Sequence, residues 1–123
     1  MYEITVVSHF SGAHRLRHLH GRCEELHGHN WKVEVSVVSA RLNKQGVVID
    51  FQVLKHRLEK VLKPLDHTYL NDLPHFSKHE PSSENIAKYI FDRLERELKG
   101  SNASLKSVTA WESETTSATY FRR

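Results

Sequence analysis

The chain has 123 residues, 38% of them hydrophobic and 27% charged, with a formal net charge of +3 at pH 7, and this length fits one domain, 1–123, with a buried core. It has no run of five Lys or Arg residues that would indicate a nucleic-acid partner, no signal-peptide pattern and no apolar run of membrane-spanning length. One cysteine cannot form an internal disulfide, so we expect a soluble cytoplasmic protein whose mild positive charge suits a small anionic substrate.

The first predicted element is a strand over residues 2–16. Ile4, Val6 and Phe10 alternate with polar residues, which is typical of a strand with one buried face. His14 has the same parity as these apolar residues, so we expect its side chain to point into the core. A polar connection, 17–26, follows this strand.

A second, valine-rich strand is predicted over 29–42. Side chains alternate between faces along a strand, so His27 and His29 share the apolar face of Trp31. With His14 they would place three imidazoles on two neighbouring strands, which is the geometry of a three-histidine zinc site with one open position. Alternatively, these histidines are polar strand ends bonded to backbone, and spacing alone does not separate the two interpretations.

A helix is predicted after the second strand. A turn at 43–46 and a short extended segment at 47–49 lead to Asp50, a good helix N-cap. Apolar residues then recur at helical spacing until Pro64, where the helix should end. Residues 65–81 are predicted to form a loop.

The last third of the chain predicts one more helix and two strands. Ser82 and Ser83 open the helix, and Gly100 is a typical stop. Strands over 105–111 and 115–121 follow, joined by a tight connection. The order strand, strand, helix, helix, strand, strand favours an α+β layer with the helices on one face of a sheet.

Cys23 and the neighbouring pair Asp66 and His67 are candidate catalytic residues. The cationic Arg22 and a nearby zinc ion would favour the thiolate of Cys23, which could then act as a base or a nucleophile. A lone cysteine is more often a small buried hydrophobe. If His67 reaches Cys23, it could exchange the proton while Asp66 orients its imidazole. Asp–His pairs in loops usually only cap turns.

Glu112 is the remaining candidate. It shares the parity of Val108 and Ala110, so an inward carboxylate at this position could bind an amino-pyrimidine edge through two hydrogen bonds. The alternative interpretation is an exposed acid at the end of a strand.

These residues lie in motifs that resemble the 6-pyruvoyl-tetrahydropterin synthase family, and most of all its bacterial branch, 6-carboxy-tetrahydropterin synthase. The spacing from Cys23 to His27 favours this branch, and the cysteine itself excludes a folate-pathway branch that has glutamate there. The motifs follow the family's order along nearly the whole chain: Phe10-Ser-Gly-Ala-His14-Arg-Leu, Cys23-x-x-Leu-His27-Gly-His29-Asn, Gly46-Val-Val-Ile-Asp50-Phe51, Leu65-Asp66-His67-x-x-Leu70-Asn71, Pro81-Ser-Ser-Glu84-Asn85, and Glu112 with Tyr120.

The resemblance implies the tunnelling fold, with a four-stranded antiparallel sheet and two helices on one face. Subunits of this family form trimers that stack in pairs as hexamers, and their active sites lie between subunits. The resemblance also assigns roles to the candidates. His14, His27 and His29 bind one Zn²⁺ per subunit, Cys23 is the catalytic base, and Asp66 and His67 relay its proton. Glu112 anchors the pterin ring and is also a catalytic member of the relay, while Ser82 and Ser83 lie near the pterin.

The implied activity is that of a zinc-dependent lyase in queuosine biosynthesis. It would convert 7,8-dihydroneopterin triphosphate to 6-carboxy-5,6,7,8-tetrahydropterin, releasing triphosphate and acetaldehyde. Two alternatives stay open. A pyruvoyl synthase would eliminate triphosphate but keep all side-chain carbons, and a non-catalytic zinc-binding assembly protein would have no turnover. Neither nucleic acid nor a membrane is an expected partner.

Overall fold

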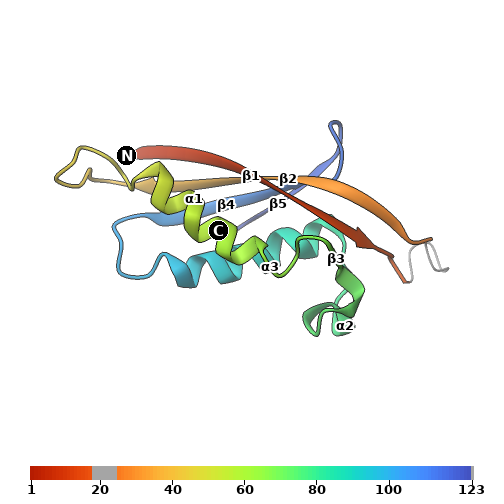
Figure 1. The fold of residues 1–123 in the computed structure, drawn as a ribbon. Helices are drawn as coiled ribbons and strands as arrows, with labels where there is room; N and C mark the ends of the chain where they lie inside the picture. The colour runs from red at the N-terminus through yellow and green to blue at the C-terminus, as the bar shows by residue number, and fades with distance from the viewer. Residues whose placement is uncertain (18–24, 123) are drawn as a thin grey trace.

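The computed structural model describes residues 1–17 and 25–122, and its sheet is built around two long antiparallel strands, β1 (Tyr2–His14) and β2 (His27–Ser39) (Figure 1). β4 (Ser104–Trp111) pairs with β2, and β5 (Ser117–Phe121) pairs with β4, both antiparallel. These strands match the prediction to within three residues at each end.

A fifth strand makes the sheet mixed. β3 (Thr68–Tyr69) pairs in parallel with Gly12 and Ala13 of β1, giving the order β3-β1-β2-β4-β5. The α+β class and the four predicted antiparallel strands are confirmed, but the prediction missed the fifth, parallel strand that makes the sheet mixed. Two residues are too few to show a strand period, and β3 exists only because distant backbone on β1 pairs with it.

Two helices, α1 (Phe51–Leu62) and α3 (Ser83–Glu97), lie on one face of the sheet, below it in Figure 1. Two short helices lie between them, a 3₁₀ turn η2 (Leu70–Asp72) and α2 (His75–Lys78), in the segment predicted to be a loop. No helix in the described part of the chain is both long and apolar enough to cross a lipid bilayer.

The ends of the two long helices follow the predicted signals. Asp50 caps α1 by accepting hydrogen bonds from the first-turn backbone, and Ser82 caps α3 by accepting from the backbone of Asn85. Gly100 takes a positive φ of 87° after α3, as a helix stop requires. The segment 47–49 forms bends rather than the expected extended piece.

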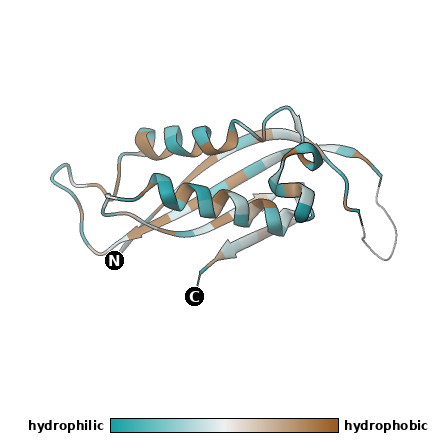
Figure 2. Ribbon diagram, turned by 90° about the horizontal axis from the view of Figure 1, so that it is seen from below, coloured by the Kyte–Doolittle hydropathy of each residue, from teal (hydrophilic) through white to brown (hydrophobic). Residues whose placement is uncertain are grey.

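The core lies between the sheet and the helices. Figure 2 looks from the helix side, with the two long helices in front of the strands. The alternation predicted for β1 and β2 is confirmed, because the even positions of β1 and the odd positions of β2 face this core. Its main side chains are Val6, Phe10, Trp31, Val33, Val35, Val37, Leu54, Leu58, Ile86, Ile90, Phe91, Leu94, Val108 and Ala110.

Candidate metal centre

Three histidines and one glutamate converge at one end of the sheet. His14 is the last residue of β1 and stands directly opposite His27, the first residue of β2, while Gly12 stands opposite His29. Glu112 follows the last residue of β4, the strand on the other side of β2. Their ligand atoms lie within 4.8 Å of one another, so the strand register assembles residues that are far apart in sequence.

The polar atoms of this cluster are in close contact. Nε2 of His14 lies 3.2 Å from Nε2 of His27, and Oε1 of Glu112 lies 3.1 Å from Nε2 of both His14 and His29. His14 is 1% exposed, whereas the other three residues are half-buried. The centre is thus closed on the His14 side and accessible on the other.

The outer nitrogens of two rings are held by backbone carbonyls. Nδ1 of His14 donates to the Pro81 carbonyl at 2.7 Å, and Nδ1 of His27 donates to the Glu25 carbonyl at 2.9 Å. A carbonyl can only accept, so each neutral ring carries its proton on Nδ1 and presents a bare lone pair at Nε2. Both lone pairs face the cluster.

This donor set fits a small divalent cation. Two facing nitrogen lone pairs and a carboxylate repel one another unless a positive charge lies between them. Imidazole nitrogen and carboxylate oxygen are common ligands of such cations. In a tetrahedral site with bonds of about 2.1 Å, neighbouring ligand atoms lie about 3.4 Å apart, close to the separations found for His14, His27 and Glu112.

Two stacked aromatic residues, Trp31 and Phe10, lie beneath the cluster on the core side. The Trp31 ring packs edge-on against His14 and His29, with centroid separations of 5.3 and 5.5 Å, and stacks on Phe10 at 5.8 Å. Trp31 is fully buried. The metal-site candidates therefore rest on a rigid apolar surface that restricts ring rotation and lowers the local dielectric.

Asp66 and His67 lie outside this cluster, beside β1. Oδ1 of Asp66 accepts from the Ser11 backbone N–H at 2.9 Å, and the backbone N–H of His67 donates to the Ser11 carbonyl at 2.6 Å. Oδ2 of Asp66 lies 3.1 Å from Nδ1 of His67. The Ser11 hydrogen bond, followed by the neighbouring His67, holds the pKa of the Asp66 carboxyl below its usual value.

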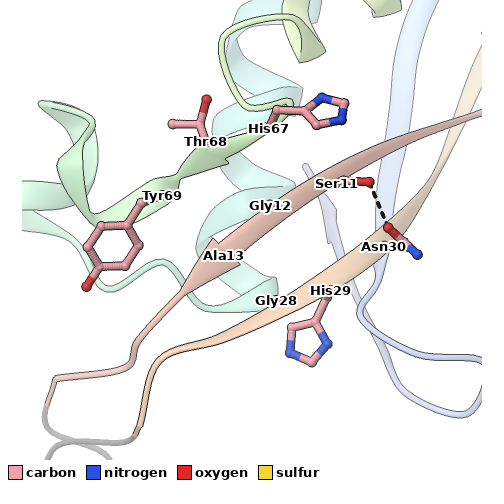
Figure 3. A pocket seen from close by; sticks show the side chains of 9 residues that line it. All are labelled: Ser11, Gly12, Ala13, Gly28, His29, Asn30, His67, Thr68 and Tyr69. Carbon is pink, nitrogen blue, oxygen red and sulfur yellow. Dashed lines mark hydrogen bonds between the residues drawn. The ribbon is translucent and has the colours of Figure 1, made fainter.

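His67 is presented to solvent. Its backbone has a positive φ of 54°, which is uncommon for a residue with a side chain, and that side chain is 82% exposed. In Figure 3, His67 and His29 lie on opposite sides of the β1–β2 pair. A depression of about 440 Å³ is bordered by Ser11, Gly12, Ala13, Gly28, His29, Asn30, His67, Thr68 and Tyr69. The structure thus brings Asp66 and His67 together, and His67 shares this depression with His29, but neither residue is among the four whose ligand atoms converge.

The remaining candidates are placed as follows. Cys23 lies outside the described residues, and its role stays a prediction. Ser82 is the N-cap of α3 and Ser83 is the first residue of that helix. Substrate contact by either serine also stays a prediction.

Two parts of the centre were not predicted from the sequence. The sequence predicted that Glu112 binds a pterin ring, but it did not predict that the carboxylate contacts His14 and His29. Its parity with Val108 and Ala110, both buried, was the available signal, but the pairing of β2 with β4 was needed to use it. The Pro81 and Glu25 carbonyls had no sequence signal, because backbone atoms are the same in every residue.

The sheet with helices on one face and the cluster of three histidines and a glutamate define an α+β protein with a candidate metal centre at one end of its sheet. A sequence profile described as 6-pyruvoyl tetrahydropterin synthase matches residues 3–123. The chain belongs to this family.

Similar proteins carry several names. 6-Carboxy-5,6,7,8-tetrahydropterin synthase of Synechocystis sp. is 42% identical over 117 residues, covering 91% of this chain and 87% of the relative. Dihydroneopterin monophosphate aldolase of Pyrococcus furiosus is 42% identical over 89 residues, covering 72% of each chain. The solved structure of 6-pyruvoyl tetrahydropterin synthase of Caenorhabditis elegans has a TM-score of 0.87 at 29% identity, covering 99% of this chain and 96% of that chain.

Proposed function

We propose that this protein converts 7,8-dihydroneopterin triphosphate to 6-carboxy-5,6,7,8-tetrahydropterin, an intermediate for queuosine synthesis, with zinc as its cofactor. The observation that carries the proposal is the convergence of His14, His27 and His29 on Glu112 in a chain of this family. Triphosphate leaves from the side chain, and one water then cleaves the two terminal carbons as acetaldehyde. The ring is reduced as the retained carbon is oxidised to a carboxylate.

His14, His27 and His29 would hold the zinc ion, one per subunit. Bound zinc would act as a Lewis acid on the hydroxyl groups of the substrate side chain. Glu112 has two carboxylate oxygens, and Oε1 lies at the cluster. In the substrate complex we assign the carboxylate to the amino-pyrimidine edge of the pterin, so that the three imidazoles alone hold the ion and the substrate side chain lies toward them.

Cys23 would remove a proton from the side chain, and His67 would relay it while Asp66 orients the imidazole. The fixed Asp66–His67 pair and its exposed ring support this assignment. Because the pair is separate from its own chain's cluster, we propose that it serves the cluster of a neighbouring subunit. This arrangement requires an oligomer, proposed here to be a hexamer of two trimers. Ser82 and Ser83 are assigned to the pterin side of the same site.

The decisive experiment is mass-spectrometric product analysis after incubation with 7,8-dihydroneopterin triphosphate and zinc. We expect 6-carboxy-5,6,7,8-tetrahydropterin with acetaldehyde and triphosphate in equal amounts. Triphosphate without acetaldehyde would instead identify a pyruvoyl synthase. The 42% identity to an aldolase adds a second candidate, cleavage of a dihydroneopterin monophosphate, which would leave the phosphate on the released fragment.

A Cys23→Ala variant separates the enzyme from a non-catalytic zinc-binding assembly protein. We expect its rate to fall about 10²–10⁴-fold, as for loss of a general base, with zinc content and oligomer size unchanged. Cys23→Ala activity equal to that of the unaltered protein would contradict the proposed role of the thiol.

A further inference from the structure

The start of α3 is tied to the metal-site histidine on β1. The Pro81 carbonyl accepts from Nδ1 of His14 at 2.7 Å, and both residues are buried. This contact selects the Nδ1–H tautomer of the neutral ring and directs the Nε2 lone pair into the cluster. For His27 the equivalent carbonyl is only two residues away, on Glu25, whereas the partner of His14 comes from 67 residues further along the chain.

Asn85 fixes the backbone around Pro81. Its side-chain amide donates to the Glu80 carbonyl at 2.9 Å, and its backbone N–H donates to Oγ of Ser82 at 3.2 Å. One residue thus contacts both neighbours of Pro81, the Glu80 carbonyl before it and the Ser82 hydroxyl after it. The proline ring restricts φ of Pro81, and the Asn85 contacts hold the residues on either side of it, which limits how far the Pro81 carbonyl can move from His14.

Glu80 ties the same segment to Arg17, three residues beyond the end of β1. Its carboxylate accepts from the Arg17 backbone N–H at 2.5 Å and from the Arg17 guanidinium at 3.2 Å. The guanidinium also donates to the Phe76 carbonyl at 2.6 Å. The Arg17 and Glu80 side chains are 26% and 33% exposed, so the ion pair is partly shielded from water. Arg17 is three residues after His14, so this contact fixes the segment that carries Pro81 relative to the histidine.

We propose that Asn85 and Glu80 are positioning residues that hold the Pro81 carbonyl against His14 and thereby set the affinity of the three-histidine cluster for its divalent cation. If the carbonyl moves away, His14 can place its proton on Nε2, where it opposes a cation. Outer-shell partners of this kind typically change metal affinity about 10–100-fold. The inference rests on the metal-binding part of the proposed function.

The test is the zinc affinity of Asn85→Asp, measured by competition with a chelator at neutral pH. This substitution removes the amide donor but keeps the shape, and an acid in the first turn of α3 favours the helix. Asn102→Asp, the same change in the exposed connection between α3 and β4, is the matched control. We expect binding about 10–100-fold weaker for Asn85→Asp and unchanged for Asn102→Asp. Glu80→Gln should weaken binding in the same direction, and it provides the test if Asn85→Asp does not fold.

A second measurement needs no metal. Nitrogen-15 spectra of the imidazoles report the tautomer of each histidine in the metal-free protein. We expect the Nδ1–H form for His14 in the unaltered protein and a mixture in Asn85→Asp. Unchanged zinc affinity in both Asn85→Asp and Glu80→Gln would overturn the proposal. Absence of zinc binding by the unaltered protein would count against the proposed function instead, and the tautomer of His14 in Asn85→Asp would still decide the role of Asn85.

Discussion

His14 and His27 face each other with their Nε2 atoms 3.2 Å apart, although each ring already donates its Nδ1 proton to a backbone carbonyl. Two neutral imidazoles cannot form a hydrogen bond in this arrangement, because neither Nε2 carries a proton. A cation between them removes the conflict. The two opposed residues therefore favour a bound cation electrostatically.

Zinc should stabilise the protein through this pair. A ligand present at 1,000 times its dissociation constant adds about 4 kcal/mol to the free energy of unfolding. We expect a gain of this size for the unaltered protein and a much smaller one for His27→Ala, measured by urea unfolding with and without zinc. His56→Ala, which removes an exposed histidine from α1, is the control and should keep the full gain. An equal gain in His27→Ala would show that zinc binds elsewhere.

The Asp66 carboxyl should make stability depend on acid pH. Its pKa in the folded protein is lowered, first by the hydrogen bond from Ser11. The lowered pKa adds to the free energy of unfolding. This added stability is present above the unfolded-state pKa and is lost as the pH falls through the folded-state pKa. In unfolding of the metal-free protein below the usual carboxyl pKa of 3.8, the unaltered chain should therefore lose more stability than Asp66→Asn. Asp72→Asn, at an exposed position, should retain the acid sensitivity of the unaltered chain.

The two serines at the start of α3 should respond differently to alanine. Ser82 is the N-cap, so Ser82→Ala should lower the free energy of unfolding by about 1 kcal/mol, while Ser83→Ala inside the helix should change it little. Their proposed place near the pterin predicts a higher KM for both variants. Chemical denaturation and steady-state kinetics on the same pair separate the cap from the substrate contact. Unchanged KM in both would remove the serines from the binding site.

Gly12 lies on the face of β1 that packs closely against Phe10, Leu65 and Leu70. A Cβ at this position would meet a ring carbon of Phe10 at 3.3 Å and the Leu65 carbonyl and Leu70 side chain at 3.6 Å. Gly12→Ala should change the free energy of unfolding by less than about 1 kcal/mol, because the small contact with Phe10 is offset by a less flexible unfolded chain. Gly12→Val should cost about 1–3 kcal/mol through overpacking. Urea titration measures both, and a larger loss for alanine than for valine would contradict this packing.

The long elements could be predicted because each one carries its own local signal. Alternation identifies β1 and β2, and Asp50 and Ser82 cap the helices that follow them. β3 and α2 have no such signal. Two residues of β3 are held by backbone pairing with β1, and α2 is a single turn after Pro74, so only the folded chain determines either element.

In the candidate site, too, some residues could be predicted from local sequence patterns and others depend on contacts between distant elements. Strand parity alone placed His14, His27 and His29 on one face, and the register of β1 and β2 then brought the rings together. The position of Glu112 depended on which strand lies next to β2, and the outer contact of His14 depended on a carbonyl of Pro81 on another element. Neither relationship leaves a pattern in neighbouring residues.

Because His14 pairs directly with His27, binding of an ion by both rings would depend on the correct register of β1 and β2. A slip of one residue between β1 and β2 turns every side chain of one strand to the wrong face. A slip of two residues keeps the valines inside but moves the two imidazoles about 7 Å apart along the strands. An ion bound by both rings would therefore stabilise one alignment among several that bury similar amounts of hydrocarbon.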